Sequence, residues 1–411
     1  MTEEFPAAEG DQSGPRRLNH MLWYGQSNSI GATLVAEGSR AISLAQPYCN
    51  LTFAGGPRAW DKAAGQWSFL PLKPLVEDDD ITGGAGGARS QLGETPCSGG
   101  ANHASRLLAR QGIAPSEHVI LASTAGRGSY RIDQLEKGAP WYAHVLAQLA
   151  AARSASEHYV CRTVSWVQGE RDADEGTPHG SYLEKLDRLQ RDLEADIQAV
   201  SGQTEPVSLL VTQVTAYARS HDDTARAQFD VQSSNPRIFI VVPSYRLPYE
   251  GHIHYLNVGA QLCGIYHGRA YAALLRGERP QMLRPLDATL SEDGMAIRVR
   301  FEAPTLPLVL GPGDGLAAVE NNGFSVKAGD QEIPIASVVA TGAEVRIALL
   351  APAPDGVHVR YGLDHAGAGR SVAGEGYGNL RDSTAETVTI EGTDYRLYNA
   401  APAFECRATR G

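Results

Sequence analysis

Residues 21–29 read Met-Leu-Trp-Tyr-Gly-Gln-Ser-Asn-Ser, an apolar run that ends at Gly25 and is followed at once by polar side chains. Such a run predicts a buried strand, and the glycine and serine after it predict a sharp turn at the strand's carboxyl end. In open α/β sheets ligands bind at that end, so Ser27 is placed to present a nucleophilic hydroxyl. A serine after a strand is also a frequent helix N-cap, and this segment alone leaves both interpretations open.

This strand opens a series of strand and helix patterns. The strands are predicted at 18–24, 118–123, 159–167, 208–214 and 237–242, and several are nearly continuous in Val, Ile and Leu. The helices are predicted at 102–111, 141–154, 182–200 and 257–275. Strand–helix alternation of this kind predicts an α/β fold, a three-layer, doubly wound sheet with five parallel strands.

The pattern changes near residue 285, where helical periodicity disappears and short alternating strands separated by turn residues begin. These strands are predicted at 295–301, 337–339, 344–349, 357–361 and 387–390. We therefore expect a disordered lead-in at 1–16, an α/β domain at 17–284, and a small all-β, sandwich-like domain at 285–411.

Composition narrows the class of protein. The chain has 411 residues, of which 42% are hydrophobic, so it can bury at least one large core. A net charge of -11 argues against a general nucleic-acid binder. No apolar run approaches the ~20 residues that cross a bilayer, and the first residues lack a signal-peptide core. We expect no membrane partner and a cytoplasmic or phage-associated protein, with export by a non-classical route still open.

The five cysteines are scattered and never paired as Cys-x-x-Cys. This spacing favours reduced thiols over a disulfide framework or a zinc site, although a single disulfide stays open. We expect no metal and no cofactor. Nothing in the sequence indicates the oligomeric state.

Polar residues follow two more of the predicted strands. Gln168 and Glu170 come directly after the strand at 159–167; the amide can donate to a developing oxyanion, and the carboxylate can orient an imidazole. Gly128 lies in the glycine-rich turn after 118–123, where a backbone N–H can point into a cleft. Ordinary loop polarity and an ordinary glycine turn would explain these segments equally well.

His254 lies just before the last predicted helix, beyond the carboxyl edge of the sheet. A general base placed there can reach Ser27. His252 and His254 could instead chelate a metal as His-x-His, but no further ligand stands at useful spacing.

Two insertions, at 45–75 and 77–100, approach the sheet on the side where Ser27 is expected, so they are candidates for lining a cleft. The second contains three aspartates at 78–80 followed by glycines, a pattern that favours a solvated loop over a calcium site. Core packing explains the tryptophans of the first insertion as well as ligand binding does. The candidates for substrate binding are Gln26, Asn28, Trp60, Trp67 and Glu94.

Four blocks together resemble the SGNH hydrolase superfamily, and within it the sialate O-acetylesterase-like branch that includes carbohydrate esterase family 6. The blocks are Gly-Gln-Ser-Asn at 25–28, Trp-Val-Gln-Gly-Glu at 166–170, the stretch 126–138, and His254 with the glycine five residues later. The resemblance covers roughly residues 18–275 and implies an SGNH, flavodoxin-like fold.

The same resemblance implies a serine esterase that removes O-acetyl groups from a carbohydrate through an acetyl-enzyme intermediate. Ser27 would be the nucleophile and His254 the general base. The oxyanion hole would combine the N–H of Ser27, an N–H near Gly128 and the side chain of Gln168.

One position departs from the branch's pattern, whose last block is usually Asp-x-x-His. Gly251 stands three residues before His254, so the acid is absent from its place. Glu250 or Glu170 could support the imidazole, or a backbone carbonyl alone could orient it. The missing acid favours a rival interpretation, a non-catalytic carbohydrate-recognition or virion/tail structural protein on a degenerate scaffold. An esterase for small non-sugar esters is a third.

Overall fold

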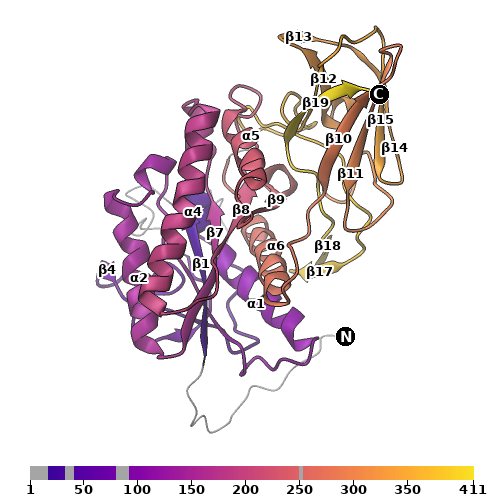
Figure 1. Cartoon of the computed structure of the whole chain (residues 1–411). Coiled ribbons are helices and arrows are strands. Elements are labelled where there is room, and N and C mark those ends of the chain that lie inside the picture. Colours follow the sequence, from indigo (N-terminus) through magenta and orange to yellow (C-terminus); the bar gives the residue numbers. More distant parts are fainter. Residues whose placement is uncertain (1–16, 33–40, 80–91, 250–252) are drawn as a thin grey trace.

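Two large β-sheets organise the chain, and the structure, a computed structural model, describes residues 17–32, 41–79, 92–249 and 253–411 (Figure 1). The strands of the first sheet lie in the order β5 (Lys73–Pro74), β2 (Leu51–Thr52), β6 (Val119–Thr124), β1 (Leu18–Gly25), β7 (Tyr159–Val167), β8 (Ser208–Gln213) and β9 (Ile238–Pro243). The five predicted strands are present and parallel. The predicted number of strands in this sheet was too low, because the first insertion adds β2 and the antiparallel β5 beyond β6.

Helices cover both faces of this sheet because β1 is apolar on both sides. Leu22 and Tyr24 pack with α2 (Ala143–Ala155) and α4 (His179–Ser201), whereas Met21 and Trp23 pack with α1 (Pro96–Ala109) and α6 (Asn257–Leu275). The first helix begins earlier than predicted, since Thr95 caps it and a proline occupies its first turn. The short helices are α3 (Glu170–Asp174), α5 (Asp223–Asp230), η1 (Ser27–Ile30), η2 (Ile132–Gln134), η3 (Pro140–Tyr142), η4 (Val231–Ser233), η5 (Ser244–Arg246) and η6 (Glu320–Gly323).

The second sheet has eight strands in one hydrogen-bonded order. They are β13 (Gln331–Glu332), β12 (Phe324–Ala328), β16 (His358–Tyr361), β19 (Phe404–Arg410), β10 (Arg284–Leu290), β11 (Ala296–Glu302), β15 (Glu344–Leu349) and β14 (Ile335–Thr341). The first and last strands of this region, β10 and β19, pair in parallel and join its two halves. The result is one curled sheet around one apolar core instead of the two separate sheets of a sandwich.

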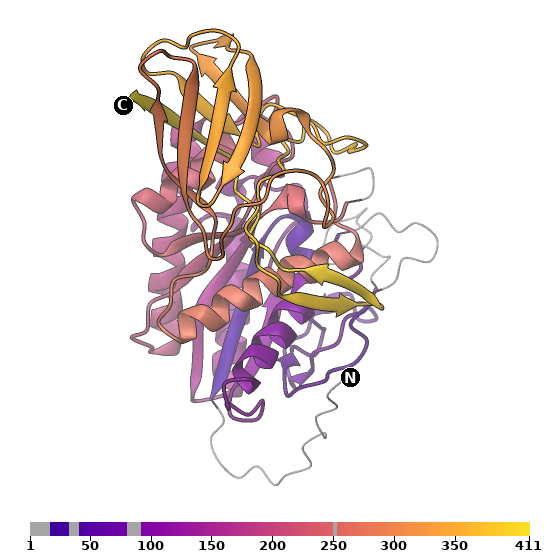
Figure 2. The same cartoon turned by 90° about the vertical axis from the view of Figure 1, so that its right-hand side faces the viewer.

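Two small hairpins complete the fold. The first, β3 (Trp60–Asp61) with β4 (Gln66–Trp67), lies in the first insertion; the second is β17 (Thr387–Ile390) with β18 (Thr393–Arg396). The second hairpin returns to the α/β region, where Val388 and Ile390 share an apolar cluster with α1 and α6 (Figure 2). The division into domains at residue 284 therefore stays a prediction, since chain from beyond it packs into the α/β region.

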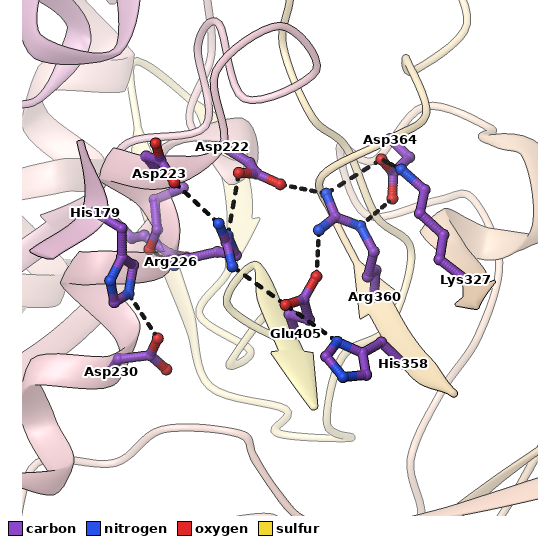
Figure 3. A network of polar contacts seen from close by, with 12 residues as sticks. His179, Asp222, Asp223, Arg226, Asp230, Lys327, His358, Arg360, Asp364 and Glu405 are labelled. Carbon is purple, nitrogen blue, oxygen red and sulfur yellow. Dashed lines mark hydrogen bonds and ion pairs between the residues drawn. The ribbon is translucent and has the colours of Figure 1, made fainter. Parts of the chain in front are cut away.

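An ion-pair network joins the second sheet to α5 (Figure 3). Arg360 on β16 is 7% exposed, and its guanidinium pairs with Asp222, Asp364 and Glu405. Arg226 on α5 also pairs with Asp222 and Glu405, so the two cations share two carboxylates across the boundary. The network therefore holds the two regions together through charge as well as through apolar contact.

Some expectations concern residues outside the described ranges. These are the lead-in at 1–16, most of the glycine-rich stretch after Asp79, and Glu250, Gly251 and His252.

Within the described ranges, no helix has the length and apolar character needed to span a bilayer, and no group of three or more acidic, histidine or cysteine side chains could hold a metal ion. All five cysteines are described, and none forms a disulfide.

Candidate active site

The turn that carries Ser27 depends on a glycine. Gly25 has a φ of 142°, and a Cβ there would lie 2.1 Å from the carbonyl oxygen of Val167 on β7. Gln26 N–H donates to that same oxygen at 2.9 Å, so β1 and β7 stay in contact to the point where the chain turns. The turn delivers Ser27 as the first residue of η1, at the carboxyl edge of the sheet.

Ser27 and His254 meet across 227 residues of sequence. The distance from Ser27 Oγ to His254 Nε2 is 3.0 Å, within hydrogen-bond range. Ser27 is 6% exposed, so its hydroxyl is largely removed from water while remaining reachable. This pairing of a hydroxyl with an imidazole is the arrangement that a general base needs to activate a nucleophile.

Asn28, the residue after Ser27, fixes the backbone on both sides of His254. Its Nδ2 donates to the carbonyl oxygen of Ile253 at 3.0 Å, and its Oδ1 accepts from the N–H of Tyr255 at 3.2 Å. The same Nδ2 donates to Glu170 Oε1 at 2.6 Å. Asn28 thus uses its whole amide inside the protein, and it ties the serine turn directly to the histidine segment.

Glu170 supports this arrangement from behind. Its carboxyl group is buried, and Oε2 makes no hydrogen bond with any described residue. Burial raises the pKa of Glu170, while the hydrogen bond from Asn28 opposes that shift. Its hydrogen bond from Asn28 links it to the histidine segment, so its geometry suits a positioning residue. Glu250, the other acid considered, lies outside the described ranges.

Gln168 is held in a buried polar network. Its Nε2 donates to the carbonyl oxygen of Tyr130 at 3.2 Å and to Asp172, and its Oε1 accepts from Tyr182 at 2.7 Å. Both amide protons are therefore engaged within the protein. Asp172, which sequence reasoning missed, also accepts from the N–H of Ile132 and so anchors the end of the glycine-rich loop.

Gln26 has the opposite arrangement. Its Oε1 accepts from the N–H groups of Gly169 at 3.4 Å and Arg171 at 3.2 Å, but its Nε2 makes no hydrogen bond with any described residue. The side chain lies in the residue directly before Ser27 and is buried. The residue directly before Ser27 thus carries an amide donor that no described residue accepts from.

The glycine-rich loop packs directly on the serine turn. Arg127 N–H donates to the carbonyl oxygen of Gly25 at 2.9 Å, and a Cβ on Gly126 would lie 2.0 Å from Ser29 Oγ. Gly128 follows two residues after Gly126, the residue that contacts the serine turn. Its N–H makes no backbone hydrogen bond in the described part of the chain, so it remains available to a ligand.

The other candidates for substrate binding lie around this turn. Trp60 and Trp67 form an edge-to-face pair with ring centroids 5.2 Å apart, and both are half-buried against a cluster that contains Ile30. Glu94 is buried and accepts from Ser43 Oγ at 2.5 Å and from two N–H groups, which holds residues 42–43 in place. Burial and the nearby charge of Glu77 raise the pKa of Glu94 to about 8.

The histidine segment also receives support from the C-terminal region. Val372 shares an apolar cluster with Val214, Ala216 and Ile253, the residue before His254. Backbone hydrogen bonds from Tyr217 N–H to the Ala373 oxygen and from Gly376 N–H to the Thr215 oxygen, both 2.9 Å, hold this segment to the loop after β8. Chain from beyond the second sheet's first strands therefore forms part of the wall behind the base.

The contacts of Asn28 lead to a specific prediction. Asn28→Ala is expected to lower kcat by roughly 10²-fold, because the histidine segment loses the two bonds that register it against Ser27. The KM for a small aryl acetate should change little. Steady-state kinetics with the aryl acetate measure both constants.

Asn19→Ala is the matched control, since Asn19 lies at the far end of β1 and donates to Val119. Its kcat should stay near wild type. A kcat that is unchanged in the Asn28 variant, or equally reduced in the control, would contradict the positioning role.

Comparisons with known proteins fit this geometry. Residues 18–273 match one family model, described as carbohydrate esterase, sialic acid-specific acetylesterase. Among solved structures, a carbohydrate acetylesterase from Xanthomonas citri is 17% identical, with a TM-score of 0.56 over 88% of this chain and 77% of that chain. At this identity the likeness shows the fold alone.

Two further structures are less similar. A protein from Arabidopsis thaliana is 19% identical, with a TM-score of 0.46 over 63% of this chain and 99% of that chain. A carbohydrate acetylesterase from Sinorhizobium meliloti is 11% identical, with a TM-score of 0.34 over 63% of this chain and 99% of that chain. No curated protein matches the sequence.

Proposed function

The chain belongs to the sialic acid-specific acetylesterase family of carbohydrate esterases, and on this premise we propose that Ser27 attacks the acetyl carbonyl of an O-acetylated carbohydrate. Members of this family are carboxylic ester hydrolases of the carbohydrate acetylesterase type. The observation that supports the serine mechanism is the 3.0 Å contact between Ser27 Oγ and His254 Nε2. A non-catalytic protein would have no need to keep this pair in register.

The reaction follows from the positions of the two groups. His254 Nε2 takes the proton of Ser27 Oγ as the oxygen bonds to the acetyl carbon, which gives a tetrahedral oxyanion. The intermediate collapses, the carbohydrate oxygen leaves with the proton from His254, and the acetyl group stays on Ser27. His254 then removes a proton from water as the water oxygen bonds to the acetyl carbon. This second tetrahedral intermediate collapses to acetate, and His254 returns its proton to Ser27 Oγ.

The oxyanion needs donors that are already aimed at it. We assign the N–H groups of Ser27 and Gly128, which make no backbone hydrogen bonds in the described residues. The sequence motif pointed to Gln168 as the side-chain donor, but its amide protons are engaged by Tyr130 and Asp172. Gln26 directly precedes Ser27 and its Nε2 donates to none of the described residues, so we propose Gln26 for this role.

Trapping the acetyl-enzyme tests the covalent step. Wild-type protein mixed with an aryl acetate and quenched in acid within one turnover should gain the mass of one acetyl group. After proteolysis the modification should map to the peptide that contains Ser27, and Ser27→Ala should gain none. An acetyl group on another side chain, or none under conditions of rapid acetate release, would rule out the proposed intermediate.

The side-chain donor has its own test. Gln26→Glu keeps the oxygen that accepts from Gly169 and Arg171 but replaces the donor with an anion, so kcat should fall by about 10²–10³-fold at temperatures where the variant stays folded. Gln168→Ala should instead lower the melting temperature, because it leaves buried polar partners unpaired. Steady-state kinetics and thermal unfolding of both variants separate the roles. A near-normal kcat in Gln26→Glu, with a large loss in a stably folded Gln168→Ala, would return the donor to Gln168.

A further inference from the structure

A cavity of about 470 Å³ lies between the α/β region and the C-terminal segment, and it includes neither Ser27 nor His254. Its wall combines residues after β9 with residues of the β17–β18 hairpin and the loop around Asp314. The residues used below are Arg246, Tyr249, Asp314, Arg370, Tyr395 and Arg396. The volume is that of pockets that hold monosaccharide-sized ligands.

Arg246 is the unusual member of this wall. It is 3% exposed, yet among the described residues no carboxylate pairs with its guanidinium. Its polar contacts include a hydrogen bond from Nη2 to the carbonyl oxygen of Arg396 at 2.8 Å and a hydrogen bond with the neutral phenol of Tyr266, and the ring of Tyr398 lies 4.4 Å from the guanidinium carbon. Its Nε is buried without a hydrogen-bond partner in the described residues.

An arginine cannot relieve such burial by losing its proton, because its pKa in water is above 12. A buried charge without a counter-ion is unfavourable, and protein interiors normally pair it. The cavity beside Arg246 is therefore a place where an added anion would complete the charge balance.

The neighbouring charges leave an excess of positive charge. Asp314 is shared by Arg396 at 3.0 Å and Arg381 at 3.3 Å, so one carboxylate serves two cations. Arg370 is neutralised by Glu375 through two hydrogen bonds of 2.9 Å. Asp394 also lines the cavity, at its exposed side. Among the described residues, four arginines therefore stand against three carboxylates, an imbalance that matches a single negative charge.

We propose that this cavity binds a small organic carboxylate of monosaccharide size, held by Arg246 and Arg396. The planar guanidinium presents two parallel N–H groups, which suit the two oxygens of a carboxylate. Tyr249 and Tyr395 supply aromatic walls that can pack against the body of the ligand. The site is separate from Ser27 and does not depend on the proposed function.

Calorimetry with glucuronate as the probe tests the proposal, with glucose as the neutral counterpart and inorganic phosphate as the alternative anion. Wild type and Ser27→Ala should bind glucuronate equally and should bind glucose much more weakly. Arg396→Gln, whose residue is half-buried, should weaken glucuronate binding by about tenfold or more. Arg246→Lys keeps the buried positive charge but loses the two parallel N–H groups of the guanidinium, so it should also weaken glucuronate binding.

Arg237→Gln is the control, because Arg237 is exposed and does not line the cavity. It should bind like wild type. The site is refuted if glucuronate fails to bind at millimolar concentration, if glucose or phosphate binds as well as glucuronate, or if binding survives in folded Arg396→Gln and Arg246→Lys proteins.

Discussion

Replacing Ser27 with alanine is expected to lower kcat for acetate release by about 10⁴-fold or more. The variant loses the oxygen that we propose as the nucleophile, while His254 and the backbone N–H groups stay in place. The Ser27 hydroxyl hydrogen-bonds His254 and no other described side chain, so the fold should be retained. Acetate release from an aryl acetate and from acetylated polysaccharides measures the effect, and circular dichroism checks the fold.

A second serine variant controls for effects of mutagenesis and purification that do not involve Ser27. Ser337 lies exposed on β14, in the second sheet, so Ser337→Ala should keep wild-type kcat. If folded Ser27→Ala releases acetate within tenfold of wild type, Ser27 is not the nucleophile. If neither wild type nor the variant releases acetate, the result supports the interpretation of the chain as a non-catalytic protein.

Replacing Arg360 with methionine is expected to reduce the free energy of unfolding by about 3–5 kcal/mol, the range seen when one partner of a buried ion pair is removed. Arg360 contacts Asp222, Asp364 and Glu405, and its loss leaves these carboxylates close together with fewer cations (Figure 3). Urea unfolding at neutral pH measures the change. Arg410→Met, which breaks an exposed pair with Asp355, should change stability by about 1 kcal/mol or less.

The Arg360 effect should also depend on pH in a definite direction. Burial alone would raise the pKa of Asp364, but hydrogen bonds from Arg360, Lys327 and Ser325 hold that pKa well below its ordinary value. The pKa of Glu405 is lowered in the same way. A depressed carboxyl pKa contributes stability above the unfolded value of about 4 and loses it as pH falls further. The difference between wild type and Arg360→Met should therefore shrink in acid, and a difference independent of pH would contradict this account.

The helices and strands that could be predicted are those in which apolar residues form a continuous run or a regular period in the sequence. The bounds of β7, β15, β17 and α6 agree with the sequence pattern because their burial is continuous or strictly periodic. Strand β19 was missed, since charged and polar residues interrupt its few buried positions. Its place in the sheet is set by pairing with β10, the first strand of the same region, and no local pattern encodes that contact.

In the candidate active site, too, local sequence patterns predict some residues, whereas contacts that form only on folding could not be predicted. Ser27 and His254 were predicted because each lies in a recognisable block at a strand or helix end. The role of Asn28 was not, because its partners at Ile253 and Tyr255 become neighbours only after the sheet has formed. Glu94 stays a candidate for substrate binding, and its hydrogen bonds to Ile42 and Ser43 could not be predicted, because those partners lie about fifty residues away in sequence.

The apolar cluster that Val372 and Ile253 share has a consequence for the order in which the protein matures. During synthesis, Ser27 and His254 leave the ribosome well before the segment that contains Val372. The nascent chain therefore holds both reactive groups while the wall behind the base is still incomplete. Full esterase activity should arise only once the segment around Val372 has been synthesised and has folded back against the loop after β8.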